Sequence, residues 1–286
     1  MPRSLIVYFS QTATTARVAE AIAAGLRSAE YQVDLCNMKE QRAPDPGGYD
    51  LLGIGSPVYF YRPPFHFRDY LNGLPQLNGL PAFTFVLHGT YRGDTGTVIR
   101  HIMAGKGAKE VGYFHCRGAD YFQGYLKQGY LFSPGHLTAE ELYQAKAFGG
   151  EVAAHIAGKQ YAKLPNDPPP RVVYRLERFL SNRWLARHAY RRLFTVDKRK
   201  CTICGVCFSM CPTANITEGK GKYPRWGRNC LLCLTCQFKC PEDAIGSPMD
   251  WLMFRPFLIY NVRNASRDPS LDHARVTQSK GYTILV

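Results

Sequence analysis

The chain has 286 residues, an apolar share of 45% and a formal net charge of +14. This composition excludes a disordered chain and allows two modest domains or one large one. The charge is uneven, with a net +3 over residues 1–165 and +11 over residues 166–286. The basic C-terminal part favours an acidic partner protein, an anionic membrane surface or an anionic substrate. Nucleic acid is not expected as a partner, because the sequence holds no helix-turn-helix, RNA-recognition or zinc-finger pattern.

The first half of the chain alternates strand-like and helix-like segments. Short apolar runs predict five strands, at residues 4–9, 31–38, 50–55, 81–87 and 110–116. Spaced apolar residues predict a helix over 15–28. Thr138, followed three residues later by Glu141, predicts a capped helix that ends near residue 157. Strands that alternate with helices are typical of a doubly wound α/β fold with a parallel sheet.

A hydroxyl-rich loop follows the first predicted strand. It begins where the first helix is expected to start and comprises Ser10, Gln11, Thr12, Ala13, Thr14 and Thr15. Hydroxyls and backbone N–H groups at a helix N-terminus bind anions, and this number of hydroxyls suits one phosphate. The G-x-G-x-x-G pattern of dinucleotide sites is absent from the segment. The loop therefore predicts a site for a single phosphate.

The rest of the chain divides by composition. Residues 117–137 form a long loop rich in Gly and Tyr, of the kind that often covers a site. The proline-rich segment 166–170 indicates a linker, and a basic amphipathic helix is expected over 171–194. A cysteine-rich region and a tail of mixed character follow. No signal peptide opens the chain and no apolar stretch is long enough to span a bilayer, so we expect a cytoplasmic protein, with membrane association on the cytoplasmic side left open.

Eight of the ten cysteines form two runs with the same spacing, C-x2-C-x2-C-x3-C-P. The first run is Cys201, Cys204, Cys207 and Cys211, and the second is Cys230, Cys233, Cys236 and Cys240. This spacing resembles that of bacterial ferredoxins with two [4Fe–4S] clusters, in which soft thiolates bind the iron. By this resemblance, one cluster takes Cys201, Cys204, Cys207 and Cys240, and the other takes Cys230, Cys233, Cys236 and Cys211.

A pair of zinc sites is the alternative for these runs, but zinc usually takes two cysteine pairs separated by a wide gap. Cys36 and Cys116 lie outside the runs, and both are expected to be buried strand cysteines.

The hydroxyl-rich loop resembles the phosphate loop of the flavodoxins, Ser/Thr-x-Thr-Gly-x-Thr, which holds the phosphate of FMN. Gln11 and Ala13 replace residues that are often glycine in relatives, and Ala13 is the larger departure because glycine allows unusual backbone angles there. The resemblance places the flavin ring between the loops after the third and fourth strands. The expected residues are Ser56, Pro57, Val58, Tyr59, Phe60, His88, Gly89, Thr90, Tyr91 and Gly93. Tyr59 or Tyr91 either stacks on the ring or shields the core.

The Ser-Pro-Val-Tyr segment and the cysteine runs together resemble iron–sulfur flavoproteins, in which a flavodoxin-like domain is fused to a two-cluster ferredoxin. The resemblance implies a flavodoxin-like parallel sheet of order 2-1-3-4-5 over residues 1–165. A linker and basic helix over 166–195, a small α+β ferredoxin domain over 196–247 and a tail over 248–286 complete the expected domains. The implied cofactors are two [4Fe–4S] clusters and FMN. A flavodoxin-like domain that has lost its flavin is the alternative.

Basic residues lie beside both predicted sites. Arg62 and Arg92 border the flavin loops; one hypothesis is that they stabilise the reduced flavin and raise its potential, and the other is that both point to solvent. Four basic residues lie near the cysteine runs: Lys198, Arg199, Lys200 and Lys239. Their positive charge either raises the cluster potentials or forms a docking face for an acidic partner. The helix 171–194 either lies on an anionic membrane or buries its apolar face between the domains, which we favour.

These features predict an electron-transfer protein that passes electrons between two [4Fe–4S] clusters and an FMN. It would couple one- and two-electron steps with redox partner proteins that have acidic docking surfaces. The alternative is an FMN-dependent reductase of a small molecule, in which the loop 117–137 closes over the substrate and His88 or His136 donates a proton. Whether the chain is an enzyme, and whether it forms a homo-oligomer, stays open. A sensor or maturation factor is a third reading that no specific motif favours.

Overall fold

The computed structural model describes residues 1–158, 164, 166–169 and 171–277, and the backbone of residues 283–285. The contacts divide the chain into two compact units. The first unit consists of Met1–Gly118 and Gly135–Pro170, and the second of Ala119–Pro134 and Arg171–Val286. The observed division differs from the expected domain boundaries because the segment 119–134 groups with the C-terminal part.

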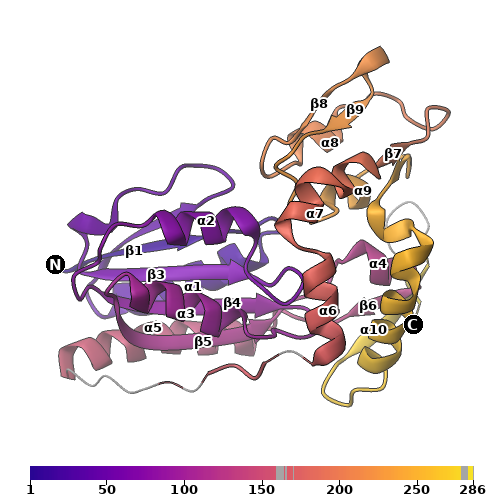
Figure 1. Cartoon of the computed structure of the whole chain (residues 1–286). Helices are drawn as coiled ribbons and strands as arrows, with labels where there is room; N and C mark the ends of the chain where they lie inside the picture. Colours follow the sequence, from indigo (N-terminus) through magenta and orange to yellow (C-terminus); the bar gives the residue numbers. More distant parts are fainter. Residues whose placement is uncertain (159–163, 165, 170, 278–282, 286) are drawn as a thin grey trace. The chain divides into compact units, whose positions relative to one another are not determined.

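Five parallel strands form the sheet of the first unit (Figure 1). They are β1 (Arg3–Tyr8), β2 (Gln32–Asn37), β3 (Leu51–Pro57), β4 (Pro81–His88) and β5 (Lys109–Arg117). Their order, β2-β1-β3-β4-β5, is that of a flavodoxin-like doubly wound sheet, which confirms the predicted fold class. The loops after β1, β3 and β4 leave the same edge of this sheet, where ligands of such folds bind.

The core of the first unit lies between the sheet and two helices, α1 (Thr14–Ser28) and α5 (Ala139–Gly158). Ile22 of α1 and Phe148 of α5 are buried there with Phe83 of β4. The two helices approach closely, because a Cβ atom on Gly25 would lie 2.0 Å from the carbonyl oxygen of Lys146. Outside this cluster, α2 (Phe65–Gly73) and α3 (Thr95–Gly105) contact each other, and η1 (Pro46–Gly48) is a short 3₁₀ turn.

The expected capping box begins α5. Thr138 Oγ1 accepts a hydrogen bond from the Glu141 N–H (3.1 Å), and the Glu141 carboxylate accepts one from the Thr138 N–H (2.7 Å). The two cysteines outside the runs are buried in strands as predicted, Cys36 in β2 and Cys116 in β5. Burial raises the pKa of the Cys116 thiol to about 12.

The cysteine-rich part of the second unit contains two similar halves. In the first half, α8 (Val206–Ser209) is followed by a hairpin of β8 (Ile216–Glu218) and β9 (Pro224–Trp226), with η3 (Lys220–Lys222) between the strands. In the second half, α9 (Thr235–Phe238) is followed by β10 (Ile245–Gly246), which pairs with β7 (Thr195–Val196). Each short helix begins one residue before the third cysteine of its run.

The segment 117–137 is not the open loop that the sequence predicts. It contains α4 (Gln123–Leu126) and β6 (Tyr130–Phe132), and β6 joins an antiparallel sheet with β11 (His273–Thr277) and β12 (Thr283–Leu285). Tyr125 is buried, with the rings of Phe122 and Phe132 at 5.0 and 5.3 Å. These aromatic residues pack within the second unit.

The predicted helix over 171–194 is divided into α6 (Val172–Leu180), α7 (Arg183–His188) and the 3₁₀ turn η2 (Tyr190–Arg192). Asn182 separates the first two, and its Oδ1 accepts a hydrogen bond from the Leu185 N–H (3.0 Å) as an N-cap. The tail is also folded, into η4 (Pro248–Asp250), η5 (Leu252–Phe254) and α10 (Arg255–Ala265). In the described part of the chain, no helix combines the length and the apolar character needed to cross a membrane.

The apolar side of α6 is exposed. The exposed fractions are 78% for Val172, 49% for Leu176 and 67% for Phe179, whereas Tyr174 and Glu177 on the opposite side are buried. The expectation that this helix buries its apolar face is therefore wrong.

Candidate functional site

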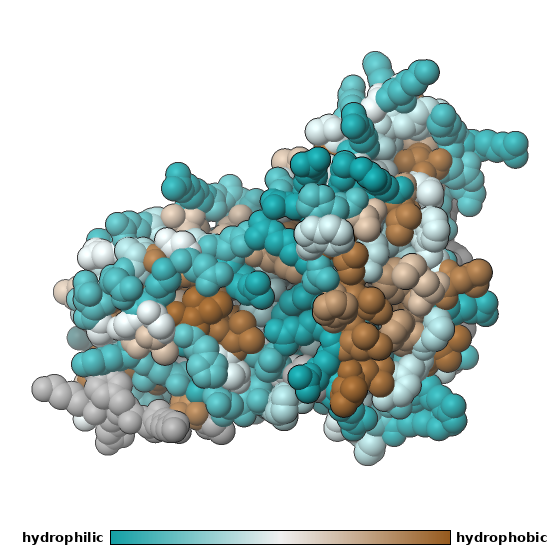
Figure 2. Space-filling model, viewed as in Figure 1, coloured by the Kyte–Doolittle hydropathy of each residue, from teal (hydrophilic) through white to brown (hydrophobic). Residues whose placement is uncertain are grey.

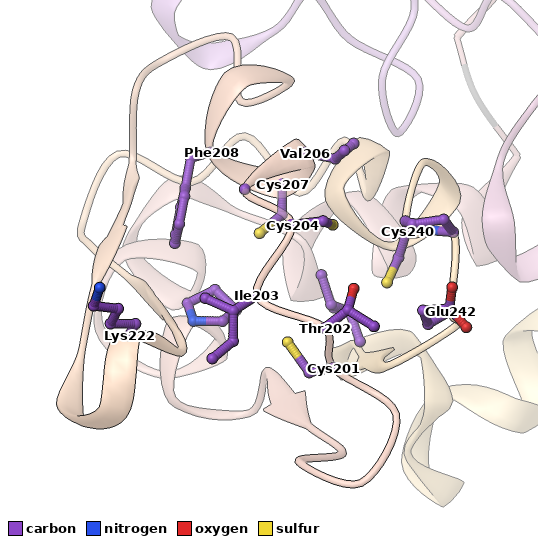
Figure 3. A pocket seen from close by; sticks show the side chains of 14 residues that line it. Cys201, Thr202, Ile203, Cys204, Val206, Cys207, Phe208, Lys222, Cys240 and Glu242 are labelled. Atoms are coloured by element: carbon purple, nitrogen blue, oxygen red, sulfur yellow. The ribbon is translucent and has the colours of Figure 1, made fainter.

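Four thiols from both cysteine runs line one hollow of the second unit. Cys201, Cys204 and Cys207 come from the first run, and Cys240 comes from the second. Figure 3 shows these side chains around a common space. Lys222 lines the hollow with its cationic side chain. Within the described residues, no three Cys, His, Asp or Glu side chains lie as close together as the ligands of one metal ion.

The other four thiols form a second group. Cys236 lies close enough to Cys233, Cys230 and Cys211 for their charges to interact, and burial raises its pKa well above the usual range. Burial, followed by the nearby Cys233, raises the pKa of Cys230 to about 12. In the first group, burial and then Cys204 raise the pKa of Cys207 to about 11. Crowded thiols that are shielded from water resist ionisation, so this arrangement suits thiolates whose charge is offset by bound iron.

The backbone around the two runs has the same conformation at equivalent positions. Ile203, Gly205 and Ala214 have φ angles of 57°, 76° and 46°. The equivalent residues of the second run, Leu232, Leu234 and Asp243, have φ angles of 57°, 56° and 46°. A side chain in this left-handed region costs about 1–2 kcal/mol, and such strain persists where the surrounding structure requires it.

Backbone N–H groups point at three of the sulfur atoms. The Asn215 N–H donates to Cys211 Sγ (3.2 Å), and the Ala244 N–H donates to Cys240 Sγ at the equivalent position (3.3 Å). A third bond joins the Leu232 N–H to Cys230 Sγ (3.4 Å). Such bonds favour the ionised form of a thiol, and hydrogen bonds to the sulfur ligands tune the potential of a bound cluster. The two groups of thiols therefore fit [4Fe–4S] clusters in number, chemistry and surroundings.

The hydroxyl-rich loop lies between β1 and α1. Ala13 is the N-cap of α1 and has φ 63° and ψ −7°, the left-handed conformation for which glycine is suited. Ser10 and Thr15 are buried, and Ser10 Oγ accepts a hydrogen bond from the Ala16 N–H (3.2 Å). Thr12 is exposed, with its Oγ1 3.3 Å from Thr14 Oγ1. The loop thus begins α1 with an alanine in a strained, left-handed backbone conformation.

Asn37 holds this loop in place, and the sequence analysis did not include it. Its Oδ1 accepts a hydrogen bond from the Ser10 N–H (3.1 Å), and its Nδ2 donates to the Glu40 carboxylate (2.9 Å). The sequence did contain a sign of this contact, because Asn37 is a polar residue at the end of an apolar strand. Neighbouring parallel strands end side by side, so the end of β2 lies next to the loop that follows β1.

The loop after β3 contacts the hydroxyl-rich loop. The Tyr59 hydroxyl donates to Gln11 Oε1, so the ring of Tyr59 is anchored at its polar end. Phe60 and Tyr61 both have left-handed backbones, with φ 49° and 59°. The loop after β4 approaches as well, because a Cβ atom on Gly93 would lie 2.9 Å from Tyr61 Cβ. The three predicted flavin loops therefore meet at one edge of the sheet.

The remaining residues predicted for this site differ in exposure. Ser56 is buried, and its Oγ donates to the carbonyl of Pro57 (2.9 Å). Thr90 is buried, whereas Val58, Gly89 and Tyr91 are half-buried. Tyr91 therefore stays a candidate for contact with a ring.

The two candidate proton donors have structural partners. Burial lowers the pKa of His88 to about 3, and its Nδ1–H donates to the carbonyl of Thr90 (3.1 Å). His136 Nδ1 lies 2.7 Å from the Glu141 carboxylate at the start of α5. His88 is therefore neutral near pH 7 and does not supply a proton as an imidazolium.

Neither arginine beside the flavin loops points freely to solvent. Arg62 is 6% exposed, and its guanidinium lies over the ring of Phe65 at 4.7 Å. Arg92 Nε lies 2.8 Å from Oδ1 of Asp167, whose side chain is buried and also accepts a hydrogen bond from the Tyr113 hydroxyl. The solvent alternative is wrong for both residues. The charge of Arg92 is balanced by a carboxylate, so Arg92 gives little support to a raised flavin potential.

The predicted basic residues of the cysteine region lie at its surface. Lys198, Arg199 and Lys200 are exposed. Lys198 Nζ lies 5.4 Å from the centre of the Tyr223 ring, and Lys239 Nζ lies 4.9 Å from that of Phe238.

Two family models match the chain. A model described as "Flavodoxin domain" matches residues 5–126, and a model described as "4Fe-4S binding domain" matches residues 194–217. The chain therefore carries an N-terminal flavodoxin domain and a C-terminal 4Fe–4S binding domain. The second match ends before the second cysteine run begins. No curated protein matches the chain.

Several solved structures match about half of the chain. A flavodoxin from the domain Archaea has 18% sequence identity and a TM-score of 0.43, over 54% of this chain and 99% of that chain. Oxidised flavodoxin 1 from Bacillus cereus has 16% identity and a TM-score of 0.41, over 54% and 98%. Rubredoxin oxygen:oxidoreductase from the anaerobe Desulfovibrio gigas has 17% identity and a TM-score of 0.41, over 56% and 37%.

Proposed function

We propose that this chain is an electron-transfer protein that binds two [4Fe–4S] clusters and one FMN. It passes electrons between these cofactors and redox partner proteins. The observation that carries the proposal is the first thiol group, which takes three thiols from one cysteine run and the fourth from the other. When bound, the clusters exchange single electrons and the FMN takes one or two, so the set couples one- and two-electron steps.

Each thiol group holds one cluster in this proposal. The first comprises Cys201, Cys204, Cys207 and Cys240, and the second comprises Cys230, Cys233, Cys236 and Cys211. The support is the crossed grouping of the thiols, the repeated left-handed backbone positions and the N–H bonds to sulfur. The chain's role is to hold the thiolates around a common space and to direct backbone N–H groups at them.

The FMN is proposed at the carboxyl edge of the parallel sheet. The phosphate would lie on the N–H groups at the start of α1 and beside the exposed Thr12 hydroxyl. The ring would lie beside the loops after β3 and β4, where Tyr59 is held by Gln11 and has little freedom to turn. The contacts among the three loops support this placement, because they preform the site before a ligand enters.

An acidic redox partner fits a hollow lined by Arg191, Arg192 and Arg225. Phe194 and Trp226 also line it, with their rings stacked at 4.8 Å. Burial raises the pKa of the Cys236 thiol and the nearby Trp226 acts in the opposite direction, so Trp226 lies near the second thiol group. Guanidinium groups bind carboxylates in pairs of hydrogen bonds. A partner bound here would therefore lie beside the second cluster.

A matched pair of double variants tests the crossed grouping. The variant Cys201→Ser/Cys240→Ser removes two thiols from one group and leaves the other complete. We expect it to keep about four of about eight irons per chain, with acid-labile sulfide in equal amount. The variant Cys201→Ser/Cys211→Ser removes one thiol from each group, and we expect it to lose most iron of both clusters.

The measurement is iron and sulfide per chain after anaerobic reconstitution, with an optical spectrum for each variant. If each run held its own cluster, the two results would be reversed. That reversal, or zinc in place of iron without sulfide, would contradict the proposed cluster sites.

A further inference from the structure

Exposed apolar side chains gather on two helical segments of the second unit. Val172, Leu176 and Phe179 lie on α6, and Leu252, Met253 and Ile259 lie on η5 and α10. We call these six residues the apolar face. Between 49% and 79% of each is exposed. Figure 2 shows hydrophobic side chains grouped over α6. Exposed apolar side chains that gather in this way mark a site of protein or membrane contact.

The packing of α6 against α10 fixes this face outward. The buried Asn261 donates from Nδ2 to the carboxylate of Glu177, also buried (2.7 Å), and the rings of Tyr174 and Tyr260 lie 6.3 Å apart. Two polar side chains of α6 thus lie on its inner side and three apolar side chains on its outer side, unlike an ordinary amphipathic helix, which buries its apolar residues. Because the internal contacts of α6 come from its other side, the apolar side chains are free to contact another surface.

Arginines border the apolar face. Arg255 and Arg263 stand one helical turn before and after Ile259, and all three line an open groove with Leu252. Arg175 is exposed on α6 between Val172 and Phe179. In the segments 171–188 and 251–267 the one carboxylate is Glu177, which is buried. The exposed charge around the face is therefore positive.

We propose that the apolar face docks on an anionic lipid bilayer, with α6 and α10 lying in the plane of the interface. Apolar side chains enter the acyl boundary while arginines meet anionic headgroups, the combination that holds interfacial helices. Trp184 and Trp251, 65% and 46% exposed, flank the face, and indole rings favour the headgroup level. A second copy is the weaker occupant, because it would bring the same arginines face to face. The inference does not depend on the proposed cofactors.

Vesicle flotation of the full chain tests the proposal. We expect flotation with vesicles of phosphatidylcholine and phosphatidylglycerol, weaker flotation with phosphatidylcholine alone, and a loss of binding at high salt. The variant Phe179→Ser/Leu252→Ser should bind the mixed vesicles at least about tenfold more weakly, because two large apolar side chains no longer enter the bilayer. The variant Arg255→Gln/Arg263→Gln should weaken binding by about tenfold as well.

Two control variants lie outside the face. Tyr143→Ser removes an aromatic side chain that is 68% exposed on α5, and Arg42→Gln removes an exposed charge of the first unit. Both should float like the unchanged chain. The proposal is overturned if the chain floats with neither vesicle, if both vesicles bind equally, or if the controls lose as much binding as the variants of the face. The face would instead belong to a second copy if the unchanged chain does not float but forms dimers in solution, and if Phe179→Ser dissociates these dimers.

Discussion

Ala13 holds a left-handed backbone at the start of α1, where the Cβ atom clashes with the neighbouring peptide. The same strain recurs at other residues of the two candidate sites, namely Phe60, Tyr61, Ile203, Leu232 and Leu234. Residues of this kind persist where tertiary structure holds them, and they concentrate at ligand sites. At residue scale, both candidate sites therefore contain residues whose local backbone preference is overruled, although Glu30, Asn78 and Ser133 show the same conformation elsewhere.

Glycine at position 13 should relieve this strain. We expect Ala13→Gly to raise the free energy of unfolding of the first unit by about 0.5–1 kcal/mol, because the gain from relieving the left-handed alanine exceeds the entropy lost by glycine. Chemical denaturation of the whole chain measures this change. Ala21→Gly, in the interior of α1, is the matched control and should lower the value by about 0.5–1 kcal/mol. A loss of stability in Ala13→Gly as large as in the control would show that position 13 carries no strain.

At the scale of elements, short apolar runs predicted the five strands, the spacing of apolar residues predicted α1, and the capping box predicted α5. The apolar pattern did not predict which side of α6 faces inward. An apolar stripe predicts burial only when no other side of the helix makes the internal contacts. Here the side of α6 with Glu177 packs inward, because Glu177 bonds to Asn261 of α10. Nor did it predict β6, because a three-residue strand gains its order from β11, which is far away in the sequence.

The buried Glu177 makes the packing of α6 on α10 pH-dependent. Burial raises the pKa of Glu177 to about 7 from the usual 4.5. Between these two pH values, Glu177 is protonated in the folded chain and ionised in the unfolded chain. The stability from the neutral carboxyl is complete below about pH 4.5 and declines as the pH rises through about 7. We expect Glu177→Gln to remove this decline and to be more stable than the unchanged chain at pH 8, by on the order of 2 kcal/mol.

Thermal and chemical unfolding between pH 5 and pH 8 would reveal this difference. Glu151→Gln, at an exposed position on α5, is the control and should leave the pH dependence of the unfolding free energy unchanged. An unaltered decline in Glu177→Gln would mean that another group is responsible.

At the scale of the whole molecule, the sequence predicted most where ligand spacing is local. The cysteine runs predicted two groups of four because both runs repeat the same ferredoxin-like spacing. The hydroxyl-rich loop could be recognised because its residues are contiguous, and its role as a phosphate site stays a prediction. The contacts of Asp167 with Arg92 and Tyr113 could not be predicted from the sequence. Asp167 lies in a proline-rich segment, and nothing in that segment indicates partners more than 50 residues earlier.

The central claim is that one chain carries two [4Fe–4S] clusters and one FMN. The most direct test is a count of iron, acid-labile sulfide and flavin on the anaerobically purified full chain. We expect about eight irons, about eight sulfides and one FMN per chain. A chain with about four irons would contradict the second cluster. A chain that contains zinc without sulfide would contradict both clusters. A chain with all its iron that neither contains nor takes up FMN would reduce the first unit to a scaffold.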